Sequence, residues 1–193
     1  RLQELRLSGN RIPEVPEEVA VLSELRVLAL DNNEIKTVPR AIGKLSRLES
    51  LLLRQNELEE LPEEVGSLVE LHTLSVSSNR LVSLPASLGQ LVLLEVLFAN
   101  GNRLGSLPAE LADLMKLRKV NLANNFIGFL PVDVEAAWGR ANVVTGKLDP
   151  DTVGSPRKVD VMVRGNPIAE PKKAEGSSSV GVGQTAATMD ETQ

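Results

Sequence analysis

The chain repeats itself with a period of 23 residues, and this period limits the possible folds more than any other feature. A leucine opens each of six successive units: Leu2, Leu25, Leu48, Leu71, Leu94 and Leu117. The same frame follows each of them, and in the third unit it reads Leu48, Leu51, Leu53, Asn56, Leu58, Leu61, Pro62, Val65 and Leu68. An internal period of this length indicates a repeat architecture, in which each unit buries its apolar face only by stacking on its neighbours.

The frame predicts the local structure of one unit. Its L-x-L part alternates with a period of two, which is typical of a short strand with one buried face. A Leu/Val-Pro step follows in each unit, from Val15-Pro16 to Leu130-Pro131. Proline fixes φ and suits the start of a helix, and the following P-x-x-[VIL]-x-x-L places its apolar residues on one face of a helical or 3₁₀ turn. Each unit is therefore expected to contain a strand, a turn and a short helix.

An asparagine follows each predicted strand at a fixed position. Backbone groups in the turn after a strand need hydrogen-bond partners, and an inward asparagine side chain carries both donors and acceptors. We therefore expect these side chains to stack as a structural ladder that joins neighbouring turns. The ladder comprises Asn10, Asn33, Asn56, Asn79, Asn102, Asn125 and Asn166.

These residues resemble the leucine-rich-repeat family over about residues 1–168. The resemblance implies an α/β fold: a right-handed solenoid bent into an arc, with a parallel β-sheet on the concave face and short helical or 3₁₀ segments on the convex face. The frame L-P-x-x-[IVL]-x-x-L is similar to that of scribble-like, Ras-suppressor-like and plant intracellular Ras-group-related repeat proteins. That likeness implies a cytoplasmic protein, with a small GTPase, phosphatase or kinase among the possible partners.

The domain organisation follows from where the frame holds. We expect a leucine-rich-repeat domain over residues 1–170, with about seven repeats, an insertion at 132–157 and a C-terminal cap repeat at 158–168. The insertion contains Trp138, which we expect to help cover the end of the stack. Residues 171–193 lack periodic apolar positions and are expected to form a disordered tail. The sequence starts at Arg1 without a methionine, so we expect the N-terminus to be truncated.

Composition argues against several classes of function. There is no cysteine, so disulfides, thiol nucleophiles and cysteine-ligated metals are excluded, and a reducing compartment is favoured. The net charge of −5 gives no basic field for nucleic acid. The sequence contains no apolar run of about 18 residues, the length that a membrane span needs.

Possible catalytic groups are few and have simpler explanations. The single histidine, His72, is expected to be an exposed rim residue. The pairs Glu17-Glu18 and Glu63-Glu64 follow prolines, where acids favour a helix N-terminus. The run from Asp149 to Gly154 lacks the ligands of a calcium loop, and Thr145-Gly146-Lys147 lacks the glycine of a phosphate loop. We therefore expect that the chain is not an enzyme and that it has no catalytic residue, metal or cofactor.

The remaining candidate is the concave face of the predicted sheet. In L-x-x-L-x-L-x-x-N, the residues between the frame positions point out of the sheet on the inside of the arc. The middle repeats place Leu52, Val96 and Phe98 there, although the frame requires nothing apolar at these positions. Apolar groups ringed by polar ones are typical of an interaction site. The predicted partner-binding residues are Leu52, Arg54, Thr73, Ser75, Ser77, Val96, Phe98 and Asn100.

The sequence thus favours a protein-interaction scaffold or adaptor that binds a protein partner on the concave face, in intracellular signalling. Three alternatives stay open at this point. The chain could be an extracellular or surface recognition module, or a regulatory domain of a larger enzyme. The concave face could also be a neutral sheet surface that binds no ligand. A nucleic-acid binder is disfavoured because the concave positions mix Arg6, Arg54 and Lys119 with acids such as Asp31 and Asp160.

Overall fold

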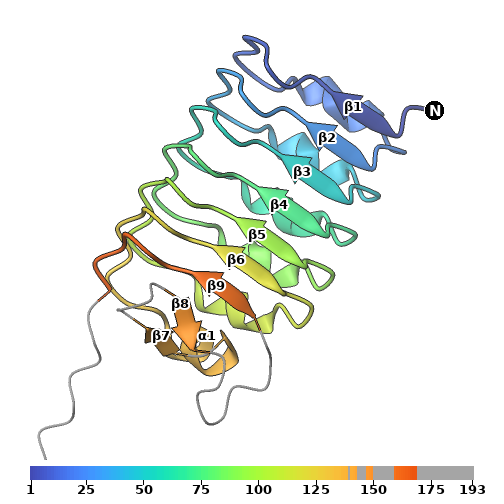
Figure 1. The fold of residues 1–193 in the computed structure, drawn as a ribbon. Helices are drawn as coiled ribbons and strands as arrows, with labels where there is room; N and C mark the ends of the chain where they lie inside the picture. The colour runs from blue at the N-terminus through green and yellow to red at the C-terminus, as the bar shows by residue number, and fades with distance from the viewer. Residues whose placement is uncertain (139, 143–146, 150–158, 169–193) are drawn as a thin grey trace, which may run out of the picture.

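One sheet runs the length of the molecule, and its strands follow the repeat frame. The computed structural model describes residues 1–138, 140–142, 147–149 and 159–168. Within these residues the sheet has nine strands in the order β1-β2-β3-β4-β5-β6-β9-β8-β7 (Figure 1). The seven strands from β1 to β6 and β9 pair in parallel, which confirms the predicted solenoid fold. They are β1 (Glu4–Arg6), β2 (Val27–Ala29), β3 (Ser50–Leu52), β4 (Thr73–Ser75), β5 (Val96–Phe98), β6 (Lys119–Asn121) and β9 (Asp160–Met162).

The pairing register equals the repeat period. In β3 and β4, Leu51 pairs with Leu74, and every other pair from β1 to β6 is offset by the same 23 positions. The last parallel pair joins Val120 to Val161, so β9 continues the sheet although 18 extra residues separate it from β6. Equivalent frame positions therefore lie side by side along the whole sheet.

Five 3₁₀ helices line the opposite side of the stack in the described residues (Figure 1). Each begins after the proline of the Leu/Val-Pro step, whose backbone is extended at φ −70° and ψ 149° in Pro62. The carbonyl of Pro62 accepts a hydrogen bond from the Val65 N–H, and the missing proline N–H costs nothing at this position. The helices are η1 (Glu17–Val21), η2 (Arg40–Lys44), η3 (Glu63–Ser67), η4 (Ala86–Gln90) and η5 (Ala109–Asp113).

Three glycines let neighbouring 3₁₀ helices approach closely. A Cβ atom built on Gly66 would lie 2.5 Å from the backbone oxygen of Ser87 in the next repeat. The same atom on Gly43 or Gly89 would lie 2.7 Å from the backbone oxygen of Glu64 or Glu110, respectively. A side chain at these positions would force the convex elements apart, so the glycines allow the convex side to stack tightly.

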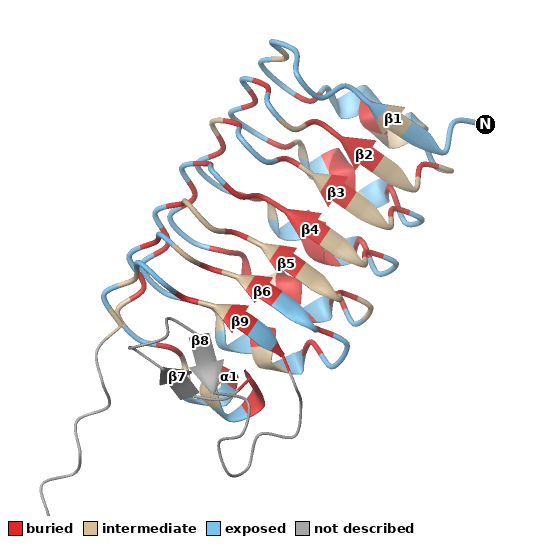
Figure 2. Ribbon diagram, in the orientation of Figure 1, coloured by how far each residue is buried: buried red, intermediate tan, exposed pale blue. Residues whose placement is uncertain are grey.

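The core between the two sides is aliphatic. Frame residues such as Leu51, Leu74 and Leu97 are fully buried, and one cluster of Leu, Val and Ile extends through the repeats. Figure 2 shows this as a buried stripe along the middle of the strands, whereas β1 at the edge is largely exposed. Stacking, and not any single repeat, therefore buries the core.

The residue before each ladder asparagine has a left-handed backbone. Gln55 has φ 55°, Ser78 has φ 57° and Gly101 has φ 68° at the same frame position. Only glycine adopts this region freely, so Gln55 and Ser78 are conformationally strained. A turn was expected after each strand, but its left-handed backbone was not anticipated from the sequence.

The insertion begins with a helix, which the repeat frame predicts after Pro131, and continues with a hairpin, which the frame does not predict. The helix α1 (Val132–Trp138) packs on η5, and the Trp138 side chain is fully buried. Strands β7 (Arg140–Asn142) and β8 (Lys147–Asp149) pair antiparallel, and β8 joins β9 in the same sense. The expected tail at 171–193 lies outside the described residues, as do residues 139, 143–146 and 150–157 of the expected insertion. Among the described residues, no helix has the length and apolar character needed to cross a bilayer.

Candidate functional site

The concave face presents three columns of side chains along the sheet. The central column is aligned by strand pairing, which makes Leu52, Ser75 and Phe98 direct neighbours on β3, β4 and β5. Thr73 and Val96 are neighbours in the column on one side. Arg54, Ser77 and Asn100 follow the ends of the strands on the other side. The full central column is Arg6, Ala29, Leu52, Ser75, Phe98, Asn121 and Met162.

A hollow of about 500 Å³ lies over the middle of this face. Seven of the eight sequence-predicted residues line it, and Val96 is the one that does not. Four further lining residues were not chosen from the sequence, although all four occupy the same columns as the predicted residues. We call this hollow the concave hollow, and its lining is Asp31, Leu52, Arg54, Thr73, Ser75, Ser77, Phe98, Asn100, Lys119, Asn121 and Met162.

Small hydroxyl side chains form the floor of the concave hollow. Ser75 and Ser77 are buried, at 8% and 3% exposure, and Thr73 is half-buried. The larger side chains Leu52 and Phe98 are half-buried on the strands to either side. Strands in a sheet lie about 4.8 Å apart, so these two side chains stand about 10 Å from one another across the serine row. The result is a notch with apolar sides.

Polar contacts hold the edges of the hollow in place. The Ser77 hydroxyl donates a hydrogen bond to Oδ1 of Asn100 at 2.6 Å. The Arg54 backbone N–H donates to Oδ1 of Asp31 at 2.7 Å. The Lys119 ammonium lies 5.5 Å from the centroid of the Phe98 ring, within the range of a cation–π interaction. These contacts join the second repeat to the third, the fourth to the fifth and the fifth to the sixth.

The ladder asparagines join the turns beside this face. Asn79 donates through Nδ2 to the carbonyls of Val76 at 3.0 Å and Leu53 at 2.9 Å, and its Oδ1 accepts from the Leu58 N–H at 3.0 Å. Five other asparagines repeat this set of bonds: Asn33, Asn56, Asn102, Asn125 and Asn166. Asn10 in the first repeat is exposed and donates within its own repeat, to Leu7 and Ser8.

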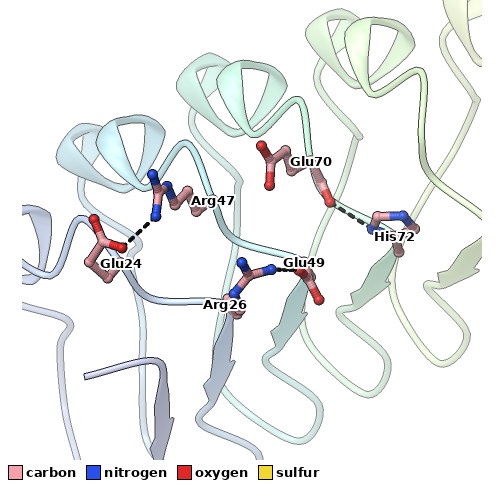
Figure 3. A network of polar contacts seen from close by, with 6 residues as sticks. All are labelled: Glu24, Arg26, Arg47, Glu49, Glu70 and His72. Carbon is pink, nitrogen blue, oxygen red and sulfur yellow. Dashed lines mark hydrogen bonds and ion pairs between the residues drawn. The ribbon is translucent and has the colours of Figure 1, made fainter. Parts of the chain in front are cut away.

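The single histidine belongs to a rim of polar contacts next to the strands. His72 Nδ1 lies 2.7 Å from the backbone oxygen of Glu70, and a carbonyl can only accept, so Nδ1 carries the proton in this contact. Arg26 pairs with Glu49, and Arg47 with Glu24, each across one repeat boundary (Figure 3). The sequence predicted an exposed side chain for His72, whereas the structure shows it half-buried. The contact with Glu70 gives His72 a local structural role.

Two other apolar surfaces lie away from the concave face. At the β1 end, a hollow is lined mainly by apolar residues that include Leu5, Ile12 and Val19, at frame positions that interior repeats bury. At the other end, Phe126 and Phe129 are 65% and 64% exposed in the loop after β6. The described residues contain no group of three or more histidine or acidic side chains that could hold a metal ion.

The fold and the asparagine ladder define a repeat solenoid, and comparisons with known proteins identify the type of repeat. A family model described as "Leucine rich repeat" matches residues 1–58, and one described as "Leucine-rich repeat region" matches residues 42–128. The repeats of this chain are therefore leucine-rich repeats, and the fold is a leucine-rich-repeat solenoid. A comparison with curated proteins gave no significant match.

Solved structures show the same architecture. A leucine-rich-repeat protein from Leptospira interrogans is 32% identical, with a TM-score of 0.56 over 69% of this chain and 40% of its own. The Arabidopsis thaliana receptor kinase ectodomain GASSHO1/SCHENGEN3, solved in complex with CASPARIAN STRIP INTEGRITY FACTOR 2, is 34% identical, with a TM-score of 0.64 over 69% of this chain and 17% of its own. The plant peptide hormone receptor RGFR1, in complex with RGF2, is 29% identical, with a TM-score of 0.65 over 70% of this chain and 23% of its own. The chain thus spans well under half the length of each of these proteins.

Proposed function

We propose that this chain is a protein-interaction module that binds a protein partner through the concave hollow and performs no catalysis of its own. The observation that carries the proposal is the notch in repeats three to five, where Leu52 and Phe98 flank the small Ser75 side chain. The repeat frame requires neither apolar side chain at these positions. Aromatic and arginine side chains beside an apolar pocket are the usual composition of an interface hot spot, and Phe98 and Arg54 supply both. Leucine-rich-repeat folds typically serve as binding scaffolds.

We further propose that the module acts as a scaffold or adaptor in intracellular signalling. The 23-residue frame with its Leu/Val-Pro step resembles the scribble-like and Ras-suppressor-like type, and the sequence has no cysteine. A small GTPase, phosphatase or kinase is the partner class that this resemblance favours. The same resemblance favours a location in the cytoplasm.

A second candidate is an extracellular or surface recognition module. Two of the similar structures are plant receptors in complex with partner molecules, and each is much longer than this chain. A third is a regulatory repeat domain of a larger enzyme. Determining the complete coding sequence and locating the tagged full-length protein separates the three: a signal peptide supports the second candidate, and an adjoining catalytic domain supports the third.

The binding site is tested with a partner identified by cross-linking and then purified. We expect Phe98→Ala and Arg54→Ala each to raise the Kd at least tenfold, as truncation of hot-spot residues typically costs about 2 kcal/mol. The matched control is Glu63→Lys on the convex side, which is expected to leave the Kd unchanged. All three variants must melt at the same temperature as the parent chain. Loss of the partner in the Glu63→Lys variant alone would move the site to the convex face.

A further inference from the structure

The charges of the concave hollow differ in sign from those of the whole protein. The chain carries a net charge of −5, but the lining of the hollow contains Arg54 and Lys119 and a single carboxylate, Asp31. Asp31 already accepts a hydrogen bond from the Arg54 backbone. Between Asp31 and Asp160, the three concave columns contain these two cations and no acid. The lining of the hollow is therefore partly apolar and carries a net positive charge on a negative protein, with Asp31 and Asp160 at its two ends.

The two cations have no carboxylate partner within the described part of the chain. Neither Arg54 nor Lys119 forms an ion pair there, and the recorded contact of the Lys119 ammonium is the Phe98 ring. Asp160 is the register partner of Lys119 in β9, but no ion pair joins the two side chains among the described residues. On the rim, Glu49 pairs with Arg26, and Glu95 lies 4.0 Å from Arg118. Neither cation is therefore neutralised by a direct ion pair in the described residues, and both side chains can contact a ligand.

We propose that the concave hollow binds an extended acidic peptide segment with one apolar side chain between two carboxylates. This deepens the proposed function, on which it rests. The apolar side chain lies over the serine floor between Leu52 and Phe98, and the two carboxylates contact Arg54 and Lys119. The interleaved apolar residues favour a peptide over a nucleic acid, which needs a row of cations along its backbone.

The geometry of the sheet sets the spacing of the two carboxylates. Arg54 and Lys119 lie three strand positions apart, from β3 to β6, and are offset by four residues along the strand direction. With strands about 4.8 Å apart and a rise of about 3.3 Å per residue, this diagonal is about 19 Å. An extended peptide covers that distance in about six residues. The ligand motif is thus acid, apolar and acid, with the apolar residue near the middle.

The test is selection of a displayed random-peptide library of about twelve residues per member, against the full chain. We expect the enriched peptides to share two acidic residues about six positions apart. For a synthetic peptide of the selected sequence, we expect Arg54→Gln and Lys119→Gln each to raise the Kd about tenfold, as for loss of a charge-assisted contact. The matched control is Arg103→Gln, which removes the same charge outside the concave columns and is expected to change the Kd less than about twofold. A single-stranded RNA oligomer is expected not to compete.

Each other outcome is decisive. Enriched peptides that are neutral or basic, or whose Kd is unaffected by Arg54→Gln and Lys119→Gln, overturn the acidic motif. If such peptides still lose affinity with Phe98→Ala, the proposed function survives and the charge assignment alone fails. Failure to enrich any peptide overturns an extended ligand and leaves a folded partner. Competition by the RNA oligomer that depends on Lys119 assigns the surface to a nucleic acid instead.

Discussion

The first and fourth repeats have nearly the same frame, but equivalent residues in the two repeats are buried to different extents. Leu2 is 47% exposed, whereas Leu71 at the same position is fully buried. Leu7 is 38% exposed, whereas Val76 at its equivalent position is fully buried. The fourth repeat lies between two neighbours, and the first has a neighbour on one side only. Burial in this fold is therefore a property of the stack, as expected for a one-dimensional array of repeats.

The other end of the described structure shows how an end is covered. Val161 in β9 is 1% exposed, and Trp138 from α1 is fully buried beside the last repeats. The hairpin β7–β8 continues the sheet in the antiparallel sense. The contrast with β1 indicates that non-repeat elements substitute for a neighbouring repeat at this end.

The largest effect is expected for leucine truncation in the two repeats. Leu74→Ala removes a fully buried side chain from the fourth repeat and is expected to lower the free energy of unfolding by about 3 kcal/mol. Leu5→Ala changes the equivalent, partly buried residue of the first repeat and is expected to cost less than half as much. Chemical denaturation measures both. Equal losses would contradict the dependence on neighbours.

The asparagine ladder offers the same comparison for polar groups. Asn79→Ala strands the Leu58 N–H and removes one of the two asparagine bonds to each of the Val76 and Leu53 carbonyls, and is expected to cost about 1–3 kcal/mol. Asn10→Ala removes exposed bonds within one repeat and is expected to change the melting temperature very little. The two melts are compared by circular dichroism. If Asn79→Ala lowers the melting temperature no more than Asn10→Ala does, the structural role of the ladder is refuted.

Glycine packing on the convex side predicts the next effect. Gly66→Ala places a methyl group against the backbone of Ser87 and is expected to cost about 1–3 kcal/mol through overpacking. Gly105→Ala is the control, because a Cβ there meets no atom within 4 Å. Differential scanning fluorimetry is sufficient to compare them. The close-approach argument fails if the control loses as much stability as Gly66→Ala.

The smallest effect has the opposite sign. Gln55 has a positive φ, and Gln55→Gly removes the strain of a left-handed backbone at the cost of a more flexible unfolded chain. We expect a net gain of about 0.5–1 kcal/mol. Glu59→Gly, in the same loop but without a positive φ, is expected to destabilise by a similar amount. A destabilised Gln55→Gly variant would show that the Gln55 side chain matters more than its backbone.

The sequence predicts the fold well because the fold repeats. The period of 23 places Leu52, Ser75 and Phe98 in one row before any coordinates are known, and strand pairing confirms this register. The β7–β8 hairpin could not be predicted, because it occurs once and has no frame to compare with. The left-handed turn did leave a signal that was not used: Gly9, Gly101 and Gly165 share the frame position of Gln55 and Ser78.

The candidate site is less accessible to sequence reasoning than the fold. The columns identify which side chains share the concave face, but not which of them form a hollow. Lys119 lies in the column of Thr73 and Val96, and only the structure brings its ammonium over the Phe98 ring. The notch arises because the small Ser75 side chain on β4 lies between the larger Leu52 on β3 and Phe98 on β5. Its binding role remains a prediction.

Two adjacent residues of β5 test the central claim most directly. Leu97 points into the core and is fully buried, whereas Phe98 is half-buried on the concave face. The measurement is the melting temperature and the Kd for the purified partner, or for the selected peptide, in Leu97→Ala and Phe98→Ala. We predict that Leu97→Ala lowers the melting temperature markedly, and that Phe98→Ala melts like the parent chain but binds at least tenfold more weakly. A Phe98→Ala variant that binds normally would contradict recognition by the concave face.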